Sequence, residues 1–260
     1  MTWLTNRCVI LAGLTLLWIP AMAQVTITYT GNMGVLLESS EHAVLIDGLH
    51  EFYKPAYLPP SEKLVADLLQ EGGNYPVPDL SLVTHYHGDH YSSQLHLGLR
   101  KTTVVGSRQV TDPLKQKSYA HTITIPYDDY RINEYQFEGM QLQAFRMDHG
   151  NEYLHKNVQN IGYLISIGGK SILHVGDTDW YEHVFDALQL PLETIDLAIL
   201  PYWLLWDDQG PQWVDQYIKP KRLLLTHIDP NISPADLKEL RHKLPGVEIF
   251  TVLGQAIVVE

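Results

Sequence analysis

Short apolar segments alternate with polar turns along the first part of the chain. Val25–Tyr29 alternates apolar and polar residues, and the apolar segments Val35–Leu37 and Ala43–Ile46 flank the polar turn Ser39–His42. This period of two predicts three β-strands. After Ser61, a residue type that suits a helix N-cap, apolar residues recur at helical spacing, so we expect a helix to follow the strands.

The rest of the chain mixes the two patterns. Helices are predicted over residues 92–99, 182–188 and 234–244. The other apolar segments are typical of strands: Leu80–Thr84, Thr102–Val105, Thr122–Ile125, Gly162–Ile167, Ser171–Val175, Leu197–Leu200, Arg222–Thr226 and Val247–Leu253. Strands interspersed with helices predict an α/β chain whose sheets are covered by helices.

The second half of the chain repeats features of the first. One predicted hairpin ends on Asp47 and another on Asp177, and the run Leu-Ser-Leu-Val-Thr-His at 80–85 is similar to Arg-Leu-Leu-Leu-Thr-His at 222–227. We expect two related βαβ-containing halves, each with polar residues at the C-terminal ends of its strands. Folds of this kind place their active sites there.

Residues 1–23 have the three parts of an export signal. Met1–Arg7 is short and positive, Cys8–Pro20 is apolar, and Ala21–Ala23 has the small-residue pattern of a cleavage site. We expect a signal peptide over 1–23, one domain over 24–260, and a secreted or periplasmic protein. The alternative is an uncleaved membrane anchor, although the apolar run is short for a bilayer. No other run approaches that length, so we expect no stable membrane span after cleavage.

Cysteine content limits the kind of metal site that the chain can build. Cys8 is the only cysteine of the 260 residues and lies in the expected signal. The mature chain then has no disulfide and no thiolate ligand, so any zinc ligand has to be histidine or carboxylate. This disfavours a closed structural zinc finger and favours a catalytic metal. At 45% hydrophobic residues, the chain can bury a sizeable core.

The chain is acidic, with a formal net charge of −12. Loss of residues 1–23 would remove one positive charge, that of Arg7, and no acid, and so change −12 to −13. An acidic protein repels phosphate backbones, which argues against a nucleic-acid-binding protein. Bound metal cations could reverse the sign locally, so a small anionic substrate is compatible with this composition. The pattern gives no oligomeric state.

A cluster of metal-ligating residue types follows the apolar run Leu80–Val83. Three histidines and an aspartate fall within six residues: His85, His87, Asp89 and His90. His85 and His87 alternate, so their side chains point the same way on an extended backbone. Imidazole and carboxylate suit zinc or another first-row divalent metal, and four donors so close together indicate one ion or two.

These residues carry a resemblance to the metallo-β-lactamase superfamily, which spans essentially the whole mature chain. The family's His-x-His-x-Asp-His motif is matched by residues 85–90. Its later landmarks are matched in order by His149, Asp177 and His227, and its early aspartate by Asp47. The resemblance implies an αββα sandwich, in which two sheets lie face to face with helices outside.

The resemblance also implies a ligand set for two divalent metal ions, zinc before manganese or iron. One ion would be held by His85, His87 and His149, and the other by Asp89, His90 and His227, with Asp177 bridging both. The implied chemistry is a metal-bridging hydroxide that attacks an ester, lactone or phosphodiester of a small molecule. Asp89 has a second implied role as the catalytic residue that orients this water or moves its proton.

Further residues are assigned around these ligands. Asp47, Thr178 and Asp179 are expected to orient the ligands, although Asp47 also fits a simple turn residue. An aromatic group beyond Asp177 could form a substrate pocket or a packed loop: Tyr202, Trp203, Trp206 and Trp213.

The remaining histidines are expected to be structural. His174 lies inside a predicted strand and should be satisfied within the sheet. His50 and His155 are exceptions, because their loops could overhang the metals. The others are interpreted as surface or packing residues: His42, His96, His121, His183 and His242.

Asp177 bears on the reaction, since true β-lactamases of the superfamily generally have serine or cysteine at this position. The residue is typical of the wider hydrolase branch of lactonases, thioesterases and phosphodiesterases. The amino-acid sequence of residues 161–179 most resembles that of the L-ascorbate-6-phosphate lactonase and N-acyl-phosphatidylethanolamine phospholipase branch. The alternatives are a persulfide dioxygenase-like oxidoreductase with one iron, a β-lactamase, and a non-catalytic metal-binding relative.

Overall fold

The structure is a computed structural model that describes residues 24–70 and 72–260. The signal peptide predicted over 1–23 therefore lies outside the described residues, and export remains a prediction. No helix among the described residues is both long and apolar enough to cross a membrane.

The strands form two seven-stranded sheets. In order across the first sheet they are β14 (Ala256–Val259), β1 (Val25–Gly31), β2 (Gly34–Glu38), β3 (Ala43–Ile46), β4 (Leu80–Leu82), β5 (Thr103–Gly106) and β6 (Thr122–Thr124). Across the second they are β13 (Glu248–Ile249), β12 (Arg222–Thr226), β11 (Leu197–Pro201), β10 (Lys170–His174), β9 (Gln159–Ile167), β8 (Met140–Asp148) and β7 (Asn133–Phe137).

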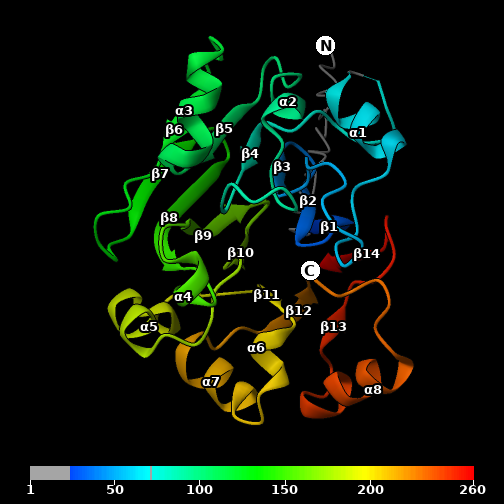
Figure 1. The fold of residues 1–260 in the computed structure, drawn as a ribbon, viewed down its shortest axis with the longest axis vertical. Coiled ribbons are helices and arrows are strands. Elements are labelled where there is room, and N and C mark those ends of the chain that lie inside the picture. The colour runs from blue at the N-terminus through cyan, green and yellow to red at the C-terminus, as the bar shows by residue number, and fades with distance from the viewer. Residues whose placement is uncertain (1–23, 71) are drawn as a thin grey trace, which may run out of the picture.

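Helices cover the outer faces of both sheets (Figure 1). The helices of the first half are α1 (Glu62–Leu69), α2 (Ser93–His96) and α3 (Arg108–Gln116). Those of the second half are α4 (Glu152–His155), α5 (Glu182–Leu188), the 3-10 helix η1 (Leu190–Leu192), α6 (Trp203–Trp206), α7 (Gly210–Tyr217) and α8 (Pro234–Lys243). α1 begins after Ser61, whose side chain accepts a hydrogen bond from the Leu64 N–H, as predicted.

The buried residues form three layers of core. The central layer joins the inner faces of the two sheets, with Tyr29 and Val35 from the first sheet and Tyr163 and Ile199 from the second. A second layer lies between the second sheet and α5–α8, and a third between the first sheet and α1–α3. This order of layers is the αββα sandwich that was predicted.

The two halves repeat one strand arrangement. Asp79, before β4, accepts a hydrogen bond from the Ala43 N–H at the start of β3, with Oδ2–N 3.0 Å. Asp196, before β11, accepts one in the same way from the Ser171 N–H at the start of β10, at 2.8 Å. The structural counterpart of β4 is therefore β11. The predicted similarity of residues 80–85 and 222–227 instead joins β4 to β12, which lies one strand further out.

Several predicted elements need correction. The strand predicted over Val247–Leu253 is limited to β13, because the chain leaves the second sheet at Phe250 and crosses to the first, where β14 pairs with β1. The helix predicted over 92–99 is the short α2. The patterns also missed α3, α4, α6, α7, β7, β8 and β14.

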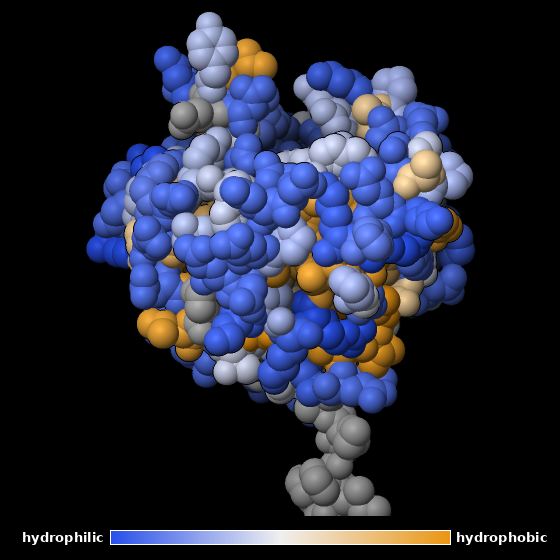
Figure 2. Space-filling view, turned by 90° about the horizontal axis from the view of Figure 1, so that it is seen from below, coloured by the Kyte–Doolittle hydropathy of each residue, from blue (hydrophilic) through white to orange (hydrophobic). Residues whose placement is uncertain are grey.

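The surface of the molecule is mostly hydrophilic on the face that Figure 2 shows. Hydrophilic side chains cover most of the face seen from below in Figure 2, the side on which α5, α7 and α8 lie. Hydrophobic side chains show between them in separate patches.

Candidate metal centre

Seven of the predicted ligands lie together at the ends of strands from both sheets. The loop after β4 supplies four of them, and the segments after β8, β10 and β12 supply one each. Their side chains form two groups, in each of which every residue contributes one potential ligand atom that lies within 4.8 Å of the others. The groups are His85, His87 and His149, and Asp89, His90, Asp177 and His227.

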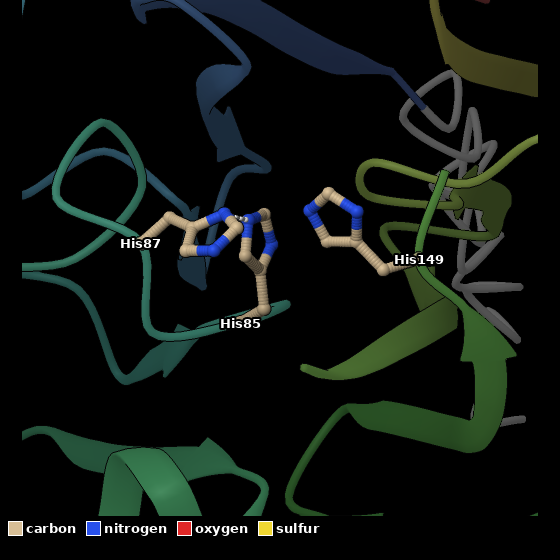
Figure 3. Close-up of side chains that lie close together, drawn as sticks. All are labelled: His85, His87 and His149. Carbon is tan, nitrogen blue, oxygen red and sulfur yellow. Dashed lines mark hydrogen bonds between the residues drawn. The ribbon is translucent and has the colours of Figure 1, made fainter. Parts of the chain in front are cut away.

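The first group consists of three imidazoles (Figure 3). His85 and His87 approach from one side with Nε2 of His85 3.0 Å from Nδ1 of His87, and His149 faces them from the other side. The ring centroid of His149 is 4.8 Å from that of His85 and 4.9 Å from that of His87. The three rings therefore converge on one point.

The second group has the dimensions of a tetrahedral metal site. Nε2 of His90 lies 3.3 Å from Oδ2 of Asp177 and 3.6 Å from Oδ2 of Asp89. Nε2 of His227 lies 3.2 Å and 3.4 Å from the same two oxygens. Ligands about 2.1 Å from a tetrahedral zinc ion are about 3.4 Å from one another. The donor atoms are thus spaced as the corners of such a site.

Hydrogen bonds orient three of the histidines so that Nε2 faces the centre. Nδ1 of His90 contacts Asp47 Oδ2 at 2.8 Å, Nδ1 of His149 contacts the Gly150 carbonyl at 2.6 Å, and Nδ1 of His85 contacts Thr84 Oγ1 at 3.0 Å. An acceptor at Nδ1 favours the tautomer with its proton there, which leaves the lone pair on Nε2 for a metal.

Buried atoms without partners test whether the site fits a metal. Four of the cluster's side-chain atoms are inaccessible to solvent and have no hydrogen-bond partner: Nε2 of His90, His149 and His227, and Oδ1 of Asp177. Buried polar atoms are rarely left unsatisfied, because each costs about 1–3 kcal/mol. A cation at the centre would satisfy all four, so the residues fit a metal.

The charges of the cluster point the same way. Burial lowers the pKa of His227, but Asp177 and Asp89 outweigh it and raise this pKa to about 9. Burial also opposes protonation of His90, whose pKa Asp177, Asp89 and Asp47 raise well above its usual range. Without a metal, the carboxylates therefore favour positive charge on the neighbouring imidazoles. In the first group burial dominates and lowers the pKa of His87 to about 4.

Asp47 supports the centre from the end of β3. Its carboxylate accepts hydrogen bonds from the Thr84 N–H at 2.8 Å, from Thr84 Oγ1 at 2.6 Å and from His90 Nδ1. Its φ is 49°, in the left-handed region. The residue thus does more than turn the chain: it links β3 to the loop that carries the histidines.

Asn32 is a buried contributor that the sequence analysis did not single out. Its Nδ2 donates to Oδ2 of Asp89 at 3.0 Å and to the Asp89 carbonyl at 3.1 Å. Its own carbonyl accepts a hydrogen bond from the His227 N–H at 2.8 Å. One residue between β1 and β2 therefore positions ligands from two distant loops, Asp89 through its side chain and His227 through its backbone carbonyl.

Thr178 and Asp179 differ in their contacts. Thr178 Oγ1 donates to the Asp148 carbonyl at 2.8 Å, and a β-bridge joins Thr178 to His149. Asp179 is exposed and accepts the Trp180 N–H at 2.8 Å. Among the hydrogen bonds and ion pairs of residues 24–70 and 72–260, none joins Asp179 to the seven clustered residues. The structure therefore brings Thr178, and not Asp179, into contact with them.

Two histidines outside the expected ligand set lie in different surroundings. The ring of His155, from α4, is 4.6 Å from that of His149 and 4.9 Å from that of His87, so it overhangs the first group. His50 is buried but belongs to neither group, and burial lowers its pKa to about 4. His174 is satisfied within the fold, as predicted: its Nε2 lies 3.1 Å from the Met33 carbonyl.

Aromatic residues border the second group. The ring of Trp203 meets that of His227 edge-on at 4.9 Å, and the ring of Tyr57 does so at 5.4 Å. Trp203 also lines a cavity of about 710 Å³ together with Tyr202 and Trp206. Three of the four predicted pocket aromatics are thus on one cavity wall. Trp213 instead packs against Trp180, with their ring centroids 5.6 Å apart.

Comparison with known proteins places this geometry in context. A family model described as "Beta-lactamase superfamily domain" matches residues 26–203. A UPF0173 metal-dependent hydrolase of Pyrococcus furiosus is 28% identical over 215 residues, covering 76% of this chain and 91% of that protein. One of Thermococcus kodakarensis is 26% identical over 228 residues, covering 83% and 92%. The metallo-beta-lactamase fold protein YhfI from Bacillus subtilis superposes with a TM-score of 0.62 at 16% identity, covering 90% of this chain and 99% of YhfI.

Proposed function

The chain belongs to the beta-lactamase superfamily and is a metal-dependent hydrolase of the metallo-beta-lactamase fold; we propose that its seven clustered residues hold two divalent metal ions. The observation that carries this proposal is the set of buried, unpartnered donor atoms at metal-like spacing. Two groups of donors, the second of which includes Asp177, favour two ions over one. Zinc suits the all-histidine and carboxylate ligand set, and manganese or iron are the alternatives.

The ligands divide as their positions suggest. One ion would lie among His85, His87 and His149, and the other among Asp89, His90 and His227. Asp177 is the residue suited to serve both, because its charge also acts on His85 and His149: burial lowers the pKa of both histidines, and Asp177 partly opposes that effect. Bound divalent ions polarise a carbonyl or phosphoryl oxygen and lower the pKa of water to about 7.

Asp89 would act on the attacking water as an acceptor that fixes its orientation. Burial raises the pKa of Asp89, but His90 and His227 have a larger effect in the opposite direction and lower this pKa to about 2. Those imidazoles would be neutral when they hold a metal, and the bound cation would then keep the carboxylate ionised in their place, so that it accepts a hydrogen bond without taking the proton at neutral pH. The hydrogen bond from Asn32 Nδ2 holds Oδ2 in place for this role. The geometry therefore favours orientation of the water over proton transfer to Asp89.

The proposed substrates are esters, lactones or phosphodiesters of small molecules. Each offers an electrophilic carbon or phosphorus and an oxygen that a cation can polarise, so no serine or cysteine nucleophile is needed. We also propose that the protein acts outside the cytoplasm, since residues 1–23 have the pattern of an export signal.

A substrate screen tests the proposal. The protein loaded with zinc or manganese is assayed against lactones, phosphodiesters, thioesters and β-lactams. We expect turnover of at least one of the first two classes, its loss with a chelator and its return with the metal. His87→Ala and Asp177→Ala should abolish turnover, whereas His242→Ala, on the exposed face of α8, should not change it.

Two results would contradict the proposal. Full turnover in Asp177→Ala would exclude this residue as a shared ligand. Oxygen consumption by an iron-loaded protein that hydrolyses none of the substrates would instead support the oxidoreductase alternative.

A further inference from the structure

A cavity beside the metal centre is lined in part by residues that closely follow two of the ligands in the chain. Asp179 follows Asp177 by two residues, Asp229 follows His227 by two, and both line the cavity. Trp203 joins the two regions, since its ring meets His227 edge-on and its Nε1 donates to the Thr178 carbonyl at 2.9 Å. The cavity is therefore adjacent to the metal centre, with the Trp203 ring between them.

Three aromatic rings form a box on one side of the cavity. The ring of Tyr202 is nearly perpendicular to that of Trp203, at 78° with centroids 5.8 Å apart, and to that of Trp206, at 84° and 6.2 Å. Both pairs therefore pack edge to face, and all three side chains line the cavity. Such boxes suit cations, because each aromatic face carries partial negative charge.

The cavity is lined by acids that have no cationic partner. Four carboxylates contribute to its wall: Asp179, Asp207, Asp229 and Asp236. Within the described part of the chain, no lysine or arginine forms an ion pair with any of them. Asp229 and Asp236 act on the aromatic box itself, since after burial their charges raise the pKa of Tyr202.

One cation near the box is already paired. Nζ of Lys243 lies 5.8 Å from the Trp206 ring centroid, but it pairs with Asp208 at 3.1 Å and with Glu239 at 3.6 Å. Lys243 is not among the residues that line the cavity. It leaves the four cavity carboxylates unneutralised.

We propose that this cavity selects substrates in which an alkylammonium group is attached to the part that reaches the metal centre. The inference deepens the proposed function and, as a statement about substrates, rests on it. The rings of Tyr202, Trp203 and Trp206 would contact the apolar body and attract the charge, while Asp229 and Asp236 would accept hydrogen bonds from the ammonium. Anionic substrates would be rejected at the same place.

Binding of three matched probes tests the cavity without any need for turnover. Cyclohexylammonium, cyclohexanol and cyclohexanecarboxylate share one ring and differ in charge. We expect titration calorimetry on the full protein at pH 7 to show at least tenfold tighter binding of the cation than of the alcohol, equivalent to about 1.4 kcal/mol, and no binding of the anion.

Variants locate the effect. Asp229→Asn with Asp236→Asn should reduce the preference for the cation to about twofold or less, and Trp206→Ala should weaken both the cation and the alcohol. Asp186→Asn removes one carboxylate charge from an exposed position on α5 and should leave all three affinities unchanged. Circular dichroism verifies that each variant is folded.

The outcomes separate this inference from the proposed function. Equal affinity for the cation and the alcohol would overturn the inference, even if the metal-loaded protein hydrolyses a neutral ester. Calcium binding that is lost in the Asp229/Asp236 variant, without any preference for cyclohexylammonium, would also overturn it, because the cavity would then be an inorganic cation site. Selective binding of the cation without turnover of any ester would support the cavity and contradict the proposed reaction.

Discussion

Asn32 shows how one residue can organise two loops of the metal centre, one through its side chain and one through its backbone carbonyl. It adopts a φ of 47°, which asparagine tolerates better than most residues. In that conformation its carbonyl faces the His227 N–H and its amide reaches both the backbone and the carboxylate of Asp89. The position of the second group of ligands therefore depends on a residue that cannot itself bind the metal well.

Replacement of Asn32 by glycine isolates the role of its amide. Glycine keeps the left-handed backbone and the carbonyl but removes the donor to Asp89. We expect the affinity of the second group of ligands for its metal ion to fall about 10- to 100-fold. Competition with a chromogenic chelator would measure this loss.

Asn151→Gly is the matched control for this prediction. Asn151 is also an asparagine in the left-handed region, with a φ of 55°, and it lies outside the two groups. It should leave metal affinity within about twofold of the wild type. An equal loss in both variants would show that backbone freedom, and not the amide of Asn32, is responsible.

The ligands and their supports differ in how visible they are in the sequence. His85, His87, Asp89 and His90 are neighbours in the chain, so their chemistry could be inferred from spacing alone. Asn32 lies 57 residues before Asp89, and its contact depends on how β1 and β2 pack. The cavity aromatics were visible as a group, but only the fold separates Trp213 from the cavity wall.

At the scale of elements, the two halves share an aspartate just before a strand, with a half-exposed side chain at Asp79 and a mostly buried one at Asp196. Asp79 and Asp196 each accept a backbone N–H from the neighbouring strand and donate their own N–H back to it. Asp196 also pairs with Lys221 at 2.8 Å. These contacts fix the register of β4 on β3 and of β11 on β10.

Alanine at either aspartate should destabilise the protein by a similar amount. Each substitution leaves a backbone donor without its acceptor, which costs about 1–3 kcal/mol. The exposed Lys221 pair adds at most about 1 kcal/mol to the loss in Asp196→Ala. Urea unfolding measures both, with Asp186→Ala on α5 as a control expected to change stability by less than about 0.5 kcal/mol. If only one of the two aspartate variants lost stability, the same hydrogen-bond geometry would not stabilise both strand pairs.

Elements with a regular pattern were predictable, and those with a mixed pattern were not. β3, α5 and β12 match the predicted segments because their apolar residues follow one period between clear polar boundaries. α3 was missed because it is mostly polar and contains Pro113. Val247–Leu253 is apolar for another reason: Phe250 and Leu253 pack into the central core while the chain crosses between the sheets, without joining a strand ladder there.

For the whole molecule, buried histidines make stability depend on pH. His96, the last residue of α2, is fully buried. Its Nε2 lies 3.1 Å from Ser81 Oγ and its Nδ1 lies 2.8 Å from the Ser92 carbonyl. Burial lowers its pKa to about 4. In the unfolded chain its pKa is about 6.5, so the unfolded state binds more protons between these values. The free energy of unfolding should therefore fall as the pH falls from about 6.5 to 4.

His96→Gln removes this titration while keeping a polar side chain. We expect the variant to lose less stability than the wild type over that pH range, by up to about 3 kcal/mol in the metal-free protein. His242→Gln on exposed α8 should behave like the wild type. Identical pH profiles for His96→Gln and the wild type would show that His96 is not the group responsible.

The central claim is that loops from both sheets jointly hold two metal ions, and the metal content of the protein tests it most directly. The protein is stripped with a chelator, incubated with excess zinc, passed through a desalting column and analysed by plasma mass spectrometry. We predict about two zinc ions per chain. A ratio near one would contradict the second ion, and a ratio near zero would contradict both, because four buried donor atoms would then have neither a hydrogen-bond partner nor a metal.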